Sequence, residues 1–80
     1  MAKRRVHLTF PECLITRPVI YDLGKRFDIV TNIRRANVEE RVGWVILEIE
    51  GPEDEIDRAI GYADDLGVQV AEIDGDVVEG

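Results

Sequence analysis

The chain has 80 residues, a formal net charge of −7 and a hydrophobic content of 45%. This length suits one small domain, and the composition is too apolar for a disordered chain. No apolar run approaches the roughly 18 residues that a membrane-spanning helix needs, so membrane insertion is not expected. The single cysteine, Cys13, cannot form an internal disulfide, which favours a reducing, cytoplasmic location.

Charge is spread unevenly along the chain. Residues 1–41 hold nine of the ten Lys and Arg residues, whereas residues 42–80 hold twelve of the seventeen Asp and Glu residues. Such asymmetry predicts that the first half attracts an anionic ligand, or that two copies meet through faces of opposite charge. The alternative is that folding mixes the two halves in space and removes the asymmetry.

The first third of the chain predicts a strand and a helix. Alternating apolar residues predict a half-buried strand over residues 5–10, which Pro11 ends because proline has no N–H for the ladder. Residues 12–17 are expected to form a loop. A helix begins at Pro18, with Thr16 as the best chemical candidate for its cap. Its apolar residues recur at helical spacing: Val19, Ile20, Leu23 and Phe27.

The middle of the chain predicts a hairpin. Residues 28–36 have mixed polarity, which suits an edge strand, and residues 37–43 form a turn. Residues 44–50 form the second strand, and its core face carries Val45, Leu47 and Ile49. Trp44 and Ile46 lie on the other face with Glu48. Arg34 and Arg35 are consecutive on a strand, so we expect them to point to opposite faces.

A second helix and a fourth strand complete the pattern. Gly51 and Pro52 open the helix, Gly67 ends it, and Gly61 inside it suggests close packing. A strand follows over residues 68–73, with an acidic tail over 74–80. The order strand–helix–strand–strand–helix–strand predicts one ferredoxin-like α+β domain over residues 1–80, with its folded core over 5–73. Two helices cover one face of a four-stranded antiparallel sheet, in which the first and third strands are central.

The sheet face without helices is the first candidate site. His7, Trp44 and Ile46 are expected there, and a monomer would leave this partly apolar patch in water. The patch predicts a homodimer that meets through the open face. The alternative is that the tail or long polar side chains cover a lone surface aromatic.

The residues give little evidence for a metal site, an enzyme or nucleic-acid binding. Cys13 and His7 are too few for a metal site, and no nucleophile–base pair or glycine-rich phosphate loop is present, so neither an enzyme nor a cofactor is expected. The ferredoxin-like frame is shared with RNA-binding domains. We judge the stacking aromatics of such domains to be absent from the central strands, and the net charge of −7 also opposes nucleic acid. Asn32 offers two donors and one acceptor, which suits an amino acid.

Several motifs together resemble the NIL domain family over residues 6–73. They are a proline that opens the first helix at Pro18, the stretch FDIVTNI at residues 27–33, the stretch GWVILEIEG at residues 43–51, Ala59 in the second helix, and the closing Gly67-Val68-Gln69-Val70. Each piece is weak alone, and their order and spacing are more specific. The family has an aliphatic residue where this chain has Arg34.

The resemblance implies an ACT-like regulatory domain. NIL domains lie at the C-terminus of methionine ABC importer ATPases, where they bind methionine and inhibit transport, and they also occur fused to ferredoxins or alone. The resemblance therefore implies an amino-acid ligand, methionine first, at a dimer interface, with a transporter or ferredoxin as partner. Ligand contacts are expected at Asn32, Ile33, Arg34 and Ala36. The rival hypothesis is a ligand-free dimerisation and docking module.

Overall fold

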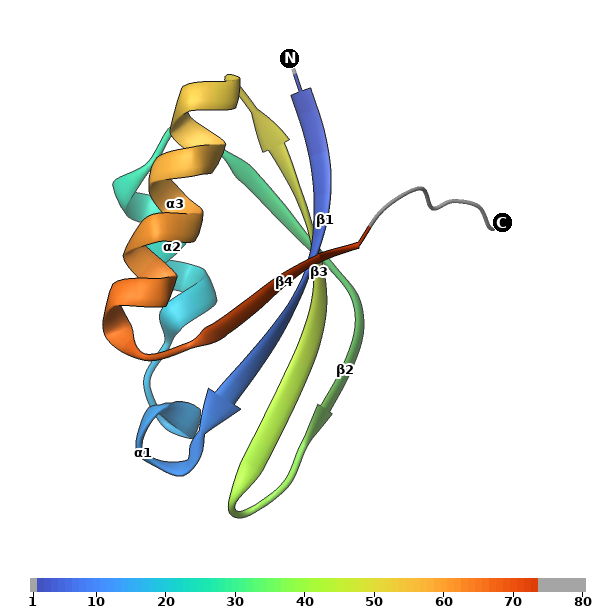
Figure 1. The fold of residues 1–80 in the computed structure, drawn as a ribbon, viewed down its shortest axis with the longest axis vertical. Coiled ribbons are helices and arrows are strands. Elements are labelled where there is room, and N and C mark those ends of the chain that lie inside the picture. Colours follow the sequence, from blue (N-terminus) through green and yellow to red (C-terminus); the bar gives the residue numbers. More distant parts are fainter. Residues whose placement is uncertain (1, 74–80) are drawn as a thin grey trace.

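The structure, a computed structural model, describes residues 2–73 as one four-stranded sheet with helices on one side (Figure 1). The sheet order is β2-β3-β1-β4, and every neighbouring pair is antiparallel. The elements in chain order are β1 (Ala2–Pro11), α1 (Glu12–Ile15), α2 (Val19–Arg26), β2 (Val30–Val38), β3 (Val42–Gly51), α3 (Glu53–Leu66) and β4 (Gln69–Ile73). The predicted ferredoxin-like α+β sandwich with central β1 and β3 is confirmed. The predicted acidic tail, residues 74–80, lies outside the described residues.

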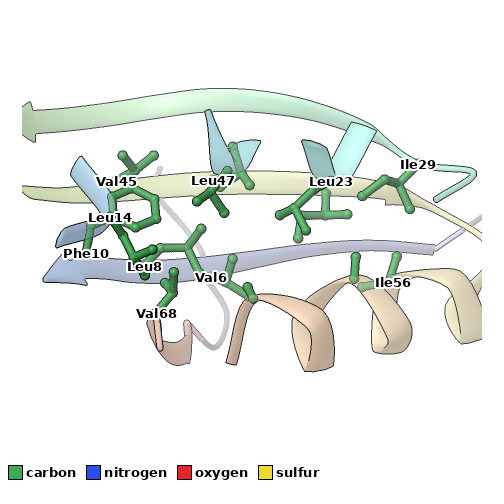
Figure 2. Close-up of a cluster of buried hydrophobic side chains, with 14 residues drawn as sticks. Val6, Leu8, Phe10, Leu14, Leu23, Ile29, Val45, Leu47, Ile56 and Val68 are labelled. Atoms are coloured by element: carbon green, nitrogen blue, oxygen red, sulfur yellow. The ribbon is translucent and has the colours of Figure 1, made fainter. Parts of the chain in front are cut away.

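One hydrophobic core fills the space between the sheet and the helices (Figure 2). Strict alternation on the two central strands supplies six of the fourteen buried residues that form this cluster among residues 2–73. Val6 on β1 and Leu47 on β3 are both fully buried and directly opposite each other. Leu23 on α2 and Ile56 on α3 close the core from the helix side. Each such aliphatic side chain stabilises the fold by about 1.5–3 kcal/mol relative to an exposed one.

The predicted loop over residues 12–17 contains a short helix, α1, and that prediction is corrected. Leu14 is the reason: it is buried, and one helical turn directs it into the core. The start of α2 also differs, because Pro18 occupies the N-cap position with no side-chain cap, so Thr16 does not cap the helix.

The hairpin is longer at its tip than predicted. β2 runs from Val30 to Val38 and β3 begins at Val42, so the turn shrinks to residues 39–41. Asp28 and Ile29 are outside the strand: the Asp28 N–H donates to Glu55 Oε1 on α3 at 2.8 Å, and the Ile29 N–H donates to the Phe27 carbonyl at 2.8 Å. The start of β2 therefore depends on a tertiary contact and a local turn that strand periodicity does not contain.

An ion-pair cluster ties the first strand to the last helix and strand. The Arg4 guanidinium on β1 donates to Asp57 on α3 and, at 3.1 Å, to Glu72 on β4. The hydrogen bond to Asp57 raises the pKa of Arg4. These partners are exposed, so each pair contributes about 0–1 kcal/mol.

Gly61 does not permit close packing, because a Cβ there would meet nothing within 4 Å outside its own helical turn. We predict that Gly61→Ala raises the free energy of unfolding by about 0.5–1 kcal/mol through the lower backbone entropy of the unfolded chain. In thermal unfolding this corresponds to a rise of a few degrees, at about 4–8 °C per kcal/mol. Gly67→Ala is the opposite control, because Gly67 has φ of 108°. A lower melting temperature for Gly61→Ala would show that this face of α3 is in contact after all.

Candidate functional site

The three predicted interface residues lie together at the centre of the open sheet face. Ile46 on β3 is directly opposite His7 on β1, and Trp44 lies two residues along β3. The His7 and Trp44 rings stack, with centroids 5.4 Å apart and planes at 20°. All three side chains are half-buried. The face therefore has an aromatic and apolar centre.

A polar cluster adjoins this centre on the same face. Asn32 on β2 is directly opposite Glu48 on β3. Arg34 Nη1 lies 3.8 Å from Glu48 Oε1, and Arg5 Nη2 lies 3.8 Å from Glu48 Oε2. An amide, a carboxylate and two guanidinium groups are thus within reach of one another. Guanidinium groups bind carboxylates, whereas a carboxylate and an amide oxygen accept hydrogen bonds from an ammonium.

A β-bulge in β2 brings Arg34 to this cluster. The register shifts between Ile33, opposite Leu47, and Arg35, opposite Ile46, so Arg34 is the extra residue. Arg35 shares the open face with Ile46, and Arg34 reaches Glu48 on that same face. The prediction that the two arginines point to opposite faces is wrong, because a bulge breaks the alternation of a regular strand.

The four predicted ligand residues are divided between the two faces of β2. Asn32 and Arg34 lie on the open face, whereas Ile33 and Ala36 lie on the helix side. There they line an apolar groove of about 240 Å³ between β2, α1 and α2. We call it the β2 groove; its lining includes Phe10, Leu14, Val19, Ile33, Ala36 and Val38.

Sequence reasoning missed the β2 groove. One wall comes from α1 and the start of α2, a segment that was predicted as a loop. The other wall comes from Ile33, Ala36 and Val38, whose spacing of three and then two residues hides a shared face unless a bulge is assumed. Apolar residues on the predicted edge strand were the one feature of the sequence that could have indicated this groove.

The charge asymmetry of the chain persists in space. The open face carries Lys3, Arg5, Arg34 and Arg35 against two carboxylates, Glu48 and Glu50. On the helix side, α3 alone carries six carboxylates and one arginine, Arg58. The two surfaces of the domain therefore have opposite charge, and the open face favours anionic groups.

Aromatic side chains are present on the open face of the central strands. His7 and Trp44 stack on the two central strands, so the statement that these strands lack stacking aromatics is wrong. The net charge of −7 still argues against nucleic acid. Cys13 is an exposed thiol. Among residues 2–73, no group of three His, Cys, Asp or Glu side chains is placed to hold a metal ion, and no helix is long and apolar enough to cross a membrane.

The sheet order and the helices on one face define a ferredoxin-like α+β domain of the ACT-like kind. The family model of the NIL domain matches residues 4–72, and the chain belongs to that family. A similar solved structure is the C-terminal domain of an ABC transporter ATP-binding protein from Enterococcus faecalis, with a TM-score of 0.78 and 21% sequence identity. The match covers 91% of this chain and 86% of that one. A search of the curated proteins finds no match.

Proposed function

We propose that this NIL domain is a non-enzymatic regulatory module that binds a small amino acid, with L-methionine as the first candidate. The cluster of Asn32, Arg34 and Glu48 on the open face carries the proposal. Family membership supports it, and so does the likeness to a domain of an ABC transporter ATP-binding protein. The cytoplasm is the proposed place of action, with a transporter ATPase or a ferredoxin as the partner that receives the signal.

The cluster has complementary groups for a zwitterion. The ligand carboxylate would bind Arg34, and its ammonium would bind Glu48 and the amide oxygen of Asn32. Its side chain would then lie over Ile46 beside Trp44. One open sheet face leaves such a ligand half in water, so a second copy packed on the same face would complete the site. This is the reason to propose a homodimer through His7, Trp44 and Ile46.

Asn32→Ala is predicted to abolish ligand-induced stabilisation. A ligand at 100 times its dissociation constant raises the free energy of unfolding by about 2.7 kcal/mol. At about 4–8 °C per kcal/mol, a thermal-shift scan against a panel of amino acids detects this easily. Asn37→Ala is the matched control, because Asn37 is on the same strand and face, opposite Trp44. Equal shifts in both variants would remove Asn32 from the site, and a flat panel for the wild type would reject the proposal.

Trp44→Arg is predicted to weaken the homodimer at least about tenfold, because central tryptophans in interfaces contribute roughly 2 kcal/mol or more. Sedimentation velocity over a concentration series measures the change. Tyr21→Ala is the control, since Tyr21 is an exposed aromatic on the helix side. A wild-type chain that sediments as a monomer at every concentration would contradict the open-face dimer.

A ligand-free docking module is the rival proposal, and one observation favours it. The β2 groove is apolar and open, and it lies on the opposite side of the sheet from the amino-acid cluster. The rival differs from the first proposal in that no amino acid binds at Asn32, and partner docking alone would then be the function.

A further inference from the structure

The exposed apolar side chains of the domain are concentrated around one edge of the sheet. Tyr21, Ile33 and Val38 are 63%, 53% and 60% exposed, and all three line the β2 groove. Exposed apolar residues scattered singly are ordinary, but a contiguous apolar groove marks a site of interaction. The groove is therefore a candidate docking surface in addition to the open face.

The groove runs along a free strand edge. β2 is the last strand of the sheet, and β3 is its only neighbour among the described strands, so its other edge has unpaired backbone groups. Beyond the bulge the register is regular from Arg35 to Val38. Four strand residues span roughly 13 Å at about 3.3 Å per residue. An edge of this length beside an apolar groove suits an extended peptide that adds a strand to the sheet.

We propose that the edge of β2 and the β2 groove bind an extended, acidic segment of a partner protein by strand addition. Side chains of an added strand alternate between the two faces of the sheet. One set enters the groove beside Ala36 and Val38. The other set lies over the open face beside Arg35. Apolar residues suit the first position and carboxylates suit the second.

Charge favours an acidic partner over a second β2. A second β2 would bring its own Arg34 and Arg35, and no carboxylate, to a sheet edge that already carries both arginines. Like charges brought close together are destabilising, so the arginines favour an acidic strand. Arg17 also lies on the groove wall, but its Nε is 4.0 Å from Asp22 Oδ2, so Arg35 is the cation that an added acidic strand would meet.

Fluorescence anisotropy with designed peptides tests the proposal. The probe is a fluorescein-labelled eight-residue peptide of alternating valine and glutamate. The first comparison peptide replaces valine by serine, and the second replaces glutamate by lysine. We expect the valine–glutamate peptide to bind and both others to bind at least tenfold more weakly. No binding, or equal binding of the serine–glutamate peptide, would overturn the proposal, since the second result shows a purely electrostatic contact.

Matched variants locate the binding surface. Val38→Asp and Arg35→Glu are each expected to lower the affinity for the valine–glutamate peptide at least tenfold. The control for the first is Val30→Asp, because Val30 is 66% exposed on the same strand but lies on the open face opposite Glu50. The control for the second is Arg41→Glu, an exposed cation in the turn. Unchanged peptide affinity in Val38→Asp would overturn the proposal. A wild-type chain that is dimeric and a Val38→Asp variant that is monomeric would also overturn it, because a second copy would then occupy this edge.

This inference does not rest on the amino-acid site. Asn32→Ala is expected to leave peptide binding unchanged, and Val38→Asp is expected to leave the amino-acid-induced thermal shift unchanged. A failure of one proposal can therefore be told from a failure of the other. Circular dichroism of each variant confirms that these exposed positions tolerate the change.

Discussion

Leu47→Ala lowers the free energy of unfolding by about 2–5 kcal/mol, and this is the largest effect of a single substitution that we predict. Leu47 is fully buried at the centre of β3, directly opposite Val6 on β1 and Ile33 on β2. A domain of this length buries only about 60% of its unfolded surface, so its total stability is modest. The variant is expected to be substantially unfolded at 37 °C, as urea titration followed by circular dichroism will show.

Ile33→Ala is the matched control for Leu47→Ala. Ile33 pairs with Leu47 on the same face of the sheet but is 53% exposed. Substitutions at exposed positions usually change the free energy of unfolding by about 0.5 kcal/mol or less. Similar losses of unfolding free energy in the two variants would mean that Ile33 belongs to the core. Core side chains would then fill the β2 groove.

Gly51→Ala is predicted to lower the free energy of unfolding by about 1–3 kcal/mol, the range for overpacking a tight site. A Cβ on Gly51 would lie 2.7 Å from the carbonyl oxygen of Asp28 and 3.3 Å from the Cα of Ile29. Both are backbone atoms, and the Asp28 N–H is also fixed to Glu55 at 2.8 Å. The segment before β2 therefore cannot yield without breaking a second contact.

Gly24→Ala is the control for Gly51→Ala. Gly24 lies in α2, where a Cβ would meet nothing within 4 Å outside its own helical turn, so alanine is expected to stabilise the helix by about 0.5–1 kcal/mol. Thermal unfolding of the two variants should show shifts of opposite sign. A neutral Gly51→Ala would indicate that the end of β3 and the start of β2 separate easily.

The central strands were predictable because their signal is local. Val6, Leu8 and Phe10 alternate with polar residues on β1, as Val45, Leu47 and Ile49 do on β3, and burial of these side chains decides which strands are central. The edges of the elements were not predictable. Leu14 turns a short loop into α1 by packing into the core, and Glu55, distant in sequence, takes the Asp28 N–H away from β2.

The candidate site was predictable in part, for the same reason. Trp44 and Ile46 alternate with core residues, so their place on the open face follows from period two alone, and His7 follows from β1. The predicted ligand residues on β2 were harder to place, because the bulge at Arg34 changes the face of every later residue in that strand. Ile33 lies on the helix side by ordinary alternation, whereas the one-residue insertion moves Ala36 there, away from Asn32 and Arg34. No pattern in residues 30–38 indicates the insertion.

Amide chemical-shift mapping with L-methionine tests the central claim most directly. The isotope-labelled chain is titrated, and the affected amides are placed on the structure. We predict shifts concentrated at residues 30–37 of β2 and 44–48 of β3, absent in Asn32→Ala and retained in Asn37→Ala. Shifts confined to α3 and β4, or no shift for methionine or any other amino acid at millimolar concentration, would contradict an amino-acid site on the open face.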